Sequence, residues 1–174
     1  MNPQNKKVLP LLLALLWSPG LALALNSDRT QPIEIESDRA EIDEGKNTAT
    51  YTGNVVVVQG SLRIQSDRLV VHGLRTADRI VAKGKPARFR QTPDGGKADV
   101  LGDALTLEYE LGKDHIKLTE QANLTQRGNT FSGHIIDYDL NKDQVRAQSD
   151  QNRSQRVRVT MQPRQAEGSN DTRP

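Results

Sequence analysis

The 174-residue sequence contains no cysteine and few aromatic residues. The absence of cysteine excludes a disulfide framework, so a folded domain must be held together by its apolar core. Trp17 belongs to an N-terminal leader, which leaves three tyrosines and two phenylalanines in the rest of the chain. Surfaces that bind carbohydrate or single-stranded nucleic acid usually rely on stacking rings. The apolar residues here are mainly aliphatic, and that composition suits alkyl chains better than sugars or bases.

Motifs for catalysis and metal binding are also scarce. The three histidines, His72, His115 and His134, form neither an HxH nor an HExxH pattern, and without cysteine a transition-metal site is not expected. Carboxylate pairs such as Glu34 and Glu36 alternate with apolar residues, which is typical of the polar face of a strand. We therefore expect no cofactor, no metal and no catalytic residue. A glycosidase carboxylate pair stays open as an alternative, because its partners need not be close in sequence.

The first 24 residues have the organisation of a secretory signal peptide. Two lysines precede a short apolar run, and Ala22-Leu23-Ala24 provides the small-x-small pattern that signal peptidase recognises. The apolar run is short for a membrane span, although an uncleaved membrane anchor remains the alternative. Cleavage after Ala24 removes Lys6 and Lys7 from the 24 basic side chains and leaves the 22 acidic ones. The mature chain is then formally neutral, so its charge does not favour nucleic acid as a partner.

The rest of the chain contains two interleaved repeats of strand-like segments. In the first repeat, a small residue and a polar residue precede two apolar residues that are two positions apart. The copies of the second repeat recur at similar intervals along the chain. Two interleaved families of this kind indicate one supersecondary unit used about four times. Alternation of period two makes the segments β-strands. The copies of the first repeat begin at Ser37, Ser66, Gly102 and Gly133, and those of the second align on Thr52, Lys83, Thr119 and Gln148.

These patterns predict an all-β fold, since no segment after the leader keeps a helical apolar period for three turns. We expect a dozen or more short strands in two facing antiparallel sheets, as an elongated, twisted jelly roll open along one side or at its ends. Pro93-Asp94-Gly95-Gly96 is typical of a hairpin turn. The domain is expected to span residues 25–162, followed by a disordered polar tail at 163–174. The repeated Ser-Asp-Arg corners favour turns at the start of strands, with a phosphate-binding arginine rim as the alternative.

The first and last strands of the domain are predicted to be sheet edges. Residues 32–37 place Ile33 and Ile35 on one face, and residues 156–162 place Val157, Val159 and Met161 on one face. Proline and arginine at these edges would guard them against unwanted pairing. Alternatively, the C-terminal edge of one subunit meets the N-terminal edge of the next, in a contact that repeats without closing. The pattern alone leaves both readings open.

The predicted interior is apolar and contains nothing reactive. If the sheets meet fully, it is only a core. If they splay apart, it is a groove lined by aliphatic side chains, which would take acyl chains at roughly 0.8 kcal/mol per buried methylene. A ligand inside this protein is therefore expected to be a lipid. The face of the Val55–Val58 run that points inward is ambiguous, because both of its faces are apolar.

Four motifs follow one another along the chain: QPIEIESDRAEID from Gln31, TYTGNVVVVQGSLRIQSDRLVV from Thr50, GKPARFRQ from Gly84 and the YEL segment from Tyr109. Together they resemble the LptA (OstA-like) family of periplasmic lipopolysaccharide-transport proteins. The resemblance covers residues 31–161. It implies a non-catalytic periplasmic protein with two sheets in an open V. It also implies that copies stack head to tail, carry lipopolysaccharide along the apolar groove, and join an LptC-like subunit at the N-terminal edge to an LptD-like subunit at the C-terminal edge.

The resemblance assigns roles to particular positions. Ile33, Ile35, Phe89 and Tyr109 match family motif positions and are expected to face lipid. Alternation along the strands extends this set to Ile42, Leu105, Leu107, Leu118, Leu124 and Tyr138. The expected subunit interface comprises Pro32, Ile33, Glu34, Ile35, Val157, Val159 and Met161. The alternatives are an LptC-like subunit with a retained membrane helix, or an exported protein that binds or cleaves glycans.

Overall fold

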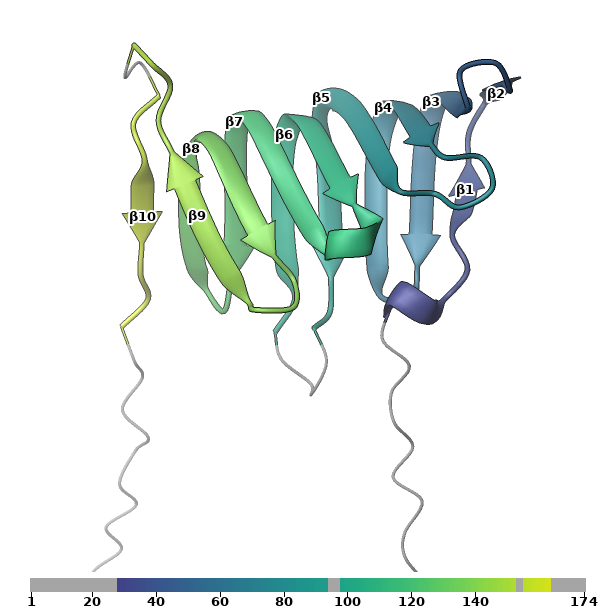
Figure 1. Ribbon diagram of the computed structural model, residues 1–174. Coiled ribbons are helices and arrows are strands. Elements are labelled where there is room, and N and C mark those ends of the chain that lie inside the picture. The colour runs from purple at the N-terminus through teal and green to yellow at the C-terminus, as the bar shows by residue number, and fades with distance from the viewer. Residues whose placement is uncertain (1–27, 94–97, 153–154, 164–174) are drawn as a thin grey trace, which may run out of the picture.

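The computed structural model describes residues 28–93, 98–152 and 155–163 of the chain (Figure 1). Two 3-10 helices, η1 (Asp28–Thr30) and η2 (Leu111–Lys113), are the only helices in these ranges, and neither is long and apolar enough to cross a membrane. The six long strands are β3 (Thr48–Gln59), β4 (Leu62–His72), β5 (Arg79–Gln91), β6 (Val100–Glu110), β7 (His115–Gln126) and β8 (Asn129–Asp139). The four short strands are β1 (Glu34–Glu36), β2 (Arg39–Asp43), β9 (Gln144–Gln148) and β10 (Arg158–Thr160).

The strands form one antiparallel sheet. Its order is β1-β3-β4-β5-β6-β7-β8-β10, with β2 also paired to β3 and β9 also paired to β8. The long strands therefore follow one another as a meander along an elongated molecule (Figure 1). The all-β antiparallel fold is confirmed. The two facing layers, however, are halves of the same long strands, and the described strands number ten rather than a dozen or more because each long strand serves both layers.

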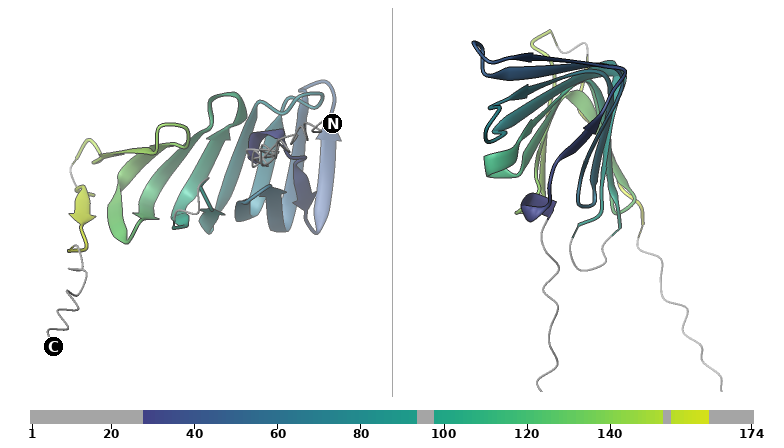
Figure 2. Two further views of the ribbon diagram at one scale, coloured as in Figure 1. Left: turned by 90° about the horizontal axis from the view of Figure 1, so that it is seen from below. Right: turned by 90° about the vertical axis from the view of Figure 1, so that its right-hand side faces the viewer.

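A line of β-bulges folds the sheet along its length, and we call this line the spine. Bulges bend the strands that contain them, so a row of bulges creases the whole sheet. The right-hand view of Figure 2 shows two layers that meet at the spine and diverge towards an open edge, the mouth. The β1 wing contains β1, β10 and one half of each long strand; the β2 wing contains β2, β9 and the other halves. The register shifts lie at Thr52/Val55, Gln65/Arg68, Lys83/Ala87, Asp103/Thr106 and Thr119/Ala122.

The repeated corners of the sequence lie on this spine. Gly53 and Asn54 have positive φ angles of 82° and 46°, and the Asp38 backbone N–H donates to the Gly53 carbonyl at 3.0 Å. The Asn54 side-chain amide also donates to the Asp38 carboxylate at 2.9 Å. Asp67, in the second Ser-Asp-Arg corner, lies inside β4 at a bulge. The prediction that this corner starts a strand is therefore wrong: it bends one.

Alternate residues of the long strands fill the space between the wings. Val55 and Val57 are 1% and 2% exposed, whereas Val56 and Val58 are half-buried, so the inward face of this run is that of Val55 and Val57. The largest fully buried side chains also include Leu62, Ile64, Leu69, Ile80, Leu107, Ile116, Leu118, Leu124, Ile136 and Tyr138. Full burial of one such side chain stabilises the fold by about 1.5–3 kcal/mol. The wings therefore hold together through an aliphatic core.

Three predictions fall on residues outside the described ranges. They concern the leader at 1–24, residues 94–96 of the expected hairpin turn, and the tail beyond Pro163. The pairing of Gln91 with Val100 shows that β5 and β6 are adjacent strands. The domain boundaries remain predictions.

Candidate lipid groove and strand edges

Six of the ten residues predicted to face lipid lie together in the core between the wings. Leu107, Leu118 and Leu124 are fully buried. Tyr109, Tyr138 and Phe89 are 2%, 1% and 3% exposed, respectively. The rings of Phe89, from the β1 wing, and Tyr138, from the β2 wing, stack with centroids 6.5 Å apart, and burial raises the pKa of the Tyr138 hydroxyl. These side chains pack against one another across the V.

Ile33 and Ile35 lie at the N-terminal end of this core. Both are half-buried and pack against it, and Ile35 sits beside Val57 on the inner face. Pro32 and Glu34 are exposed, and Glu34 aligns with Val58 on the outer face. The alternation expected for β1 is therefore present, with isoleucines inward and glutamates outward.

Two predicted lipid-facing residues do not join the buried cluster. Leu105 lies in the register shift between Asp103 and Thr106, where strict alternation breaks, and is only half-buried. Its neighbour Ala104 takes the buried position instead. Ile42, on edge strand β2, is 65% exposed. Placing Leu105 and Leu107 on one face was thus wrong, because a bulge between them inserts an extra residue.

The mouth contains a cleft near its N-terminal end. Its volume is about 420 Å³, and its lining combines aliphatic and polar side chains from both wings. The Gln59 side-chain amide donates to the Gln31 carbonyl at 3.3 Å, and the Tyr109 hydroxyl donates to Gln59 Oε1 at 3.5 Å. The lining residues are Gln31, Ile33, Gln59, Thr76, Ala77, Tyr109, Leu111 and Gly112. Of these residues, Tyr109 belongs to the core and Ile33 packs against it, so the cleft lies at the edge of that core.

Polar contacts join the two wings at the C-terminal end of the mouth. Arg127, in the turn after β7 on the β1 wing, forms an ion pair with Asp143, in the turn before β9 on the β2 wing. Gln126 donates a hydrogen bond to the same carboxylate, and the Tyr138 hydroxyl approaches it at 3.4 Å. Polar contacts therefore join the wings at both ends of the mouth, through Arg127 and Asp143 here and through Tyr109 and Gln59 at the cleft. Sequence reasoning missed the ion pair, because Arg127 and Asp143 become neighbours only when the sheet folds.

Each wing ends in a short strand at either end of the molecule. β1 runs from mouth to spine and β10 from spine to mouth. β2 runs from spine to mouth and β9 from mouth to spine. Among the described residues, no strand pairs with the outer sides of these four strands. Val157, Val159 and Met161 are 40%, 42% and 74% exposed around β10, so the predicted C-terminal interface residues lie at a free edge.

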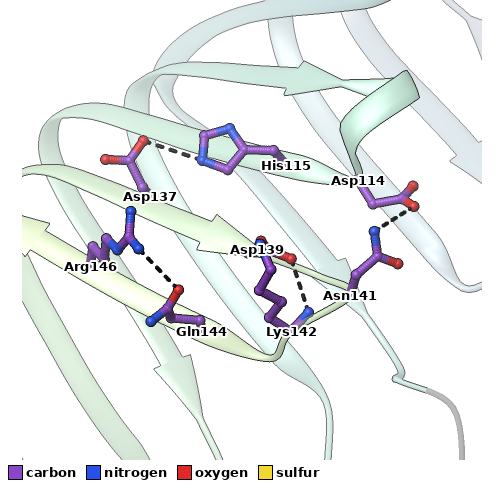
Figure 3. Close-up of polar contacts among 8 residues, drawn as sticks. All are labelled: Asp114, His115, Asp137, Asp139, Asn141, Lys142, Gln144 and Arg146. Atoms are coloured by element: carbon purple, nitrogen blue, oxygen red, sulfur yellow. Dashed lines mark hydrogen bonds and ion pairs between the residues drawn. The ribbon is translucent and has the colours of Figure 1, made fainter.

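The outer face of the β2 wing is polar. His115 Nε2 lies 3.4 Å from Asp137 Oδ1 (Figure 3), and the Arg79 guanidinium lies 3.3 Å from the Glu108 carboxylate. His134 lies on the spine, where its ring meets Gln155 Oε1 at 3.2 Å. Within the described ranges, no three acidic or histidine side chains gather in a group that could hold a metal ion. Charged groups thus lie on the outside of the β2 wing, whereas the buried side chains between the wings are mainly apolar.

Comparison with known proteins gives a consistent set of relatives. Residues 34–145 match the family model described as LptA/(LptD N-terminal domain) LPS transport protein. The chain is 39% identical to the lipopolysaccharide export system protein LptA of Escherichia coli (strain K12) over 172 residues, which cover 96% of this chain and 91% of that protein. It is 36% identical to the Haemophilus influenzae protein of the same name over 175 residues, or 97% and 99% of the two chains.

A solved structure has the same fold. It is the crystal structure of LptH, described as the LptA-homologous periplasmic component of the lipopolysaccharide transport device of Pseudomonas aeruginosa. The TM-score is 0.73 at 32% identity, and the match covers 79% of this chain and all of that one.

Proposed function

The chain belongs to the LptA/(LptD N-terminal domain) family of lipopolysaccharide transport proteins, and from that premise we propose that it is a periplasmic carrier that bridges the two membranes. It binds the acyl chains of lipopolysaccharide between its wings and catalyses no reaction. One observation supports this function most directly. The interior of the V is continuously apolar, and the two wings are joined at the spine, where the long strands pass from one wing to the other.

Acyl chains enter by replacing contacts between the wings. The core side chains fill the centre of the V, so bound hydrocarbon has to move the wings apart. Each methylene buried contributes roughly 0.8 kcal/mol, and a chain of about a dozen carbons contributes on the order of 10 kcal/mol. That gain offsets the lost packing between residues such as Phe89 and Tyr138, because the same aliphatic surface stays covered. The cleft lined by Ile33 and Tyr109 is the starting point for this separation.

End-to-end stacking extends the groove. When one copy follows another along the long axis, β10 of the first and β1 of the second are antiparallel. Rows across the β1 wing place Ile35 level with Val159, and Glu36 level with Arg158. The inner pair is apolar and the outer pair has opposite charges, so both faces suit pairing. Pro32, Ile33, Glu34, Val157 and Met161 complete the proposed interface.

The two ends take different partners in the transport machine. The N-terminal edge with β1 receives an LptC-like subunit of the inner membrane, and the C-terminal edge with β10 meets an LptD-like subunit of the outer membrane. The family model covers both LptA and the N-terminal domain of LptD, and strand pairing between such related folds continues one sheet into the next. The expected signal peptide at 1–24 supports a place in the periplasm.

In-cell photo-crosslinking tests the groove. A photoreactive residue at Ile33 or Phe89 is expected to cross-link to lipopolysaccharide, and one at the outward-facing Glu34 is not. Glu34 is the matched control, because it lies on the same short strand as Ile35 but points outside the V. Equal labelling at all three positions, or none at Ile33 and Phe89, would remove the groove as the lipid site.

A further inference from the structure

The outer face of the β2 wing carries a row of alternating charges that stops at strand β9. Glu108 lies directly opposite Lys117, Lys117 opposite Asp137, and Asp137 opposite Arg146. Opposite charges at facing positions of neighbouring strands stabilise a sheet. Arg146 is the last member of the row. Its guanidinium contacts Gln144 Oε1 at 3.3 Å (Figure 3), and no described strand covers the outer side of β9.

The same row begins at the other end of the molecule with an acid. Glu41 on β2 leads through Thr50, Val70 and Val81 to Glu108 by direct pairing. Glu41 is exposed and forms no direct ion pair with the described residues, although the charge of Lys46, which is hydrogen-bonded to Asp43, also acts on it. The row on the β2 wing thus ends in a cation at the C-terminal edge and in an anion at the N-terminal edge, and no described strand lies beyond either of them.

We propose that β9 of one copy pairs with β2 of the next in a level register, in which Arg146 faces Glu41 of the following copy. This joint rests on the end-to-end stacking proposed above and adds a second seam to the β10–β1 contact. On the inner face, Val145 then lies beside Ile42. Ile42, 65% exposed in the single chain, becomes covered by the neighbouring subunit. Both wings, rather than one, continue from subunit to subunit.

Backbone geometry supports this register. The β2 wing consists of β2, the six long strands and β9, which is eight strands in alternating directions. In an antiparallel sheet, a residue directs its N–H and C=O to one side only, and this side alternates along a row. Because the wing has an even number of strands, the first and last residues of each row behave alike. Either both direct their backbone N–H and C=O groups outward, or both direct them into the sheet. A slip of one residue would mismatch them and would also turn the inner side chains outward.

Slips of two residues are disfavoured by charge. One such slip places Arg146 opposite Arg39, which sets two cations face to face. The other places Arg146 opposite Asp43, whose carboxylate already accepts a 2.6 Å hydrogen bond from the Lys46 ammonium. The level register instead brings Arg146 to Glu41, whose carboxylate lies in the field of Lys46 but forms no direct ion pair with the described residues.

Charge reversal of the purified mature chain tests the pair. Arg146→Glu and Glu41→Arg should each weaken self-association roughly tenfold, measured by sedimentation, because attraction at one facing pair becomes repulsion. The double variant carrying both changes restores opposite charges across the joint and should associate more tightly than either single variant. The repulsion between the introduced glutamate and Asp137 lies within one chain and is shared with the Arg146→Glu variant. Glu44→Arg, in the exposed turn after β2, is the matched control. Single variants that associate like this control, or a double variant weaker than both singles, would overturn the proposed pair.

Engineered cysteines report the register directly, since the native chain has none. In the level register Ala40 faces Ala147, and facing Cα atoms about 4.5–5.5 Å apart allow a disulfide. The variant with cysteines at both positions should oxidise to a ladder of linked chains. Cysteines at Ala40 and Val145 should not, because a diagonal offset of two residues is about 7–8 Å.

A third pair separates this joint from the proposed function. Cysteines at Glu34 and Thr160 report the β10–β1 seam, where these residues lie at one height. Linkage there without linkage at Ala40 and Ala147 would refute the second seam and leave the stacking of the proposed function intact. Linkage at neither pair, with no self-association, would refute both.

Discussion

Replacing Ile35 by aspartate separates lipid binding from folding. Ile35 is half-buried on a three-residue edge strand and contacts the end of the core. Loss of that partial burial costs about 1 kcal/mol of folding free energy, which lowers the melting temperature of a domain this size by roughly 3–5 °C. The long strands that make up the centre of the V do not depend on this side chain. The variant should therefore remain folded.

The effect on lipid is expected to be larger. An aspartate at this position removes apolar contact with about two methylenes, worth roughly 1.6 kcal/mol. It also places a carboxylate beside hydrocarbon, at a cost of about 1–3 kcal/mol. Together these terms amount to about 2.6–4.6 kcal/mol and predict a loss of affinity of about a hundredfold to a thousandfold. The assay is displacement of a fluorescent lipopolysaccharide from the purified protein, with far-ultraviolet circular dichroism to follow the β-sheet.

Two matched variants make the result interpretable. Ile35→Leu keeps the apolar contact, and Glu34→Asp changes the outer face of the same strand; both should bind within about twofold of the native chain. An Ile35→Asp protein that melts a few degrees lower but binds lipopolysaccharide normally would refute a lipid path past this residue. Phe89→Asp is a poorer test, because Phe89 is 3% exposed and stacks on Tyr138, so a charge there would unfold the core.

Three further predictions concern the fold. Leu118→Ala should reduce the free energy of unfolding in urea by about 2–5 kcal/mol, whereas Leu101→Ala, at a position 46% exposed, should cost less than about 1 kcal/mol. Gly53→Ala should cost about 1–2 kcal/mol in the same assay, because φ is positive and the new Cβ would approach the Asp38 carboxylate; a neutral result would refute a strained spine. The pKa of Glu110 is lowered chiefly by a hydrogen bond from the lysine in η2. Its stabilising contribution is therefore present at neutral pH and is lost as pH falls through that lowered pKa. An NMR titration midpoint above 4.5 would contradict this.

Local patterns were sufficient to predict most of the sheet. The alternation in residues 32–37 placed Ile33 and Ile35 on one face and Glu34 on the other, and two of the four free edge strands were located, one at each end. Alternation depends only on the pleat of a strand, so it can be read without knowing the neighbours. It failed at Leu105, because a bulge adds a residue and reverses the faces beyond it. The repeats in the sequence coincide with the bulges. The sequence indicated them only as corners, however, and did not show that these corners lie within strands.

Contacts between distant segments could not be inferred in this way. The ion pair of Arg127 with Asp143 depends on the angle between the wings, and the row from Glu41 to Arg146 depends on the register of eight strands. No local sequence pattern determines the ion pair or the row. Both depend on the bulges and registers of all the strands that lie between the residues involved.

The sequence by itself determined an all-β chain with an aliphatic inner face, polar outer faces and two short edge strands, since these follow from side-chain type and period-two alternation. Only the tertiary structure decided that one sheet supplies both layers, that Leu105 leaves the buried face, and that Arg146 and Glu41 end the same row. The physical reason is that a bulge adds only one residue to a strand, yet it bends the strand and reverses the faces of the residues that follow it.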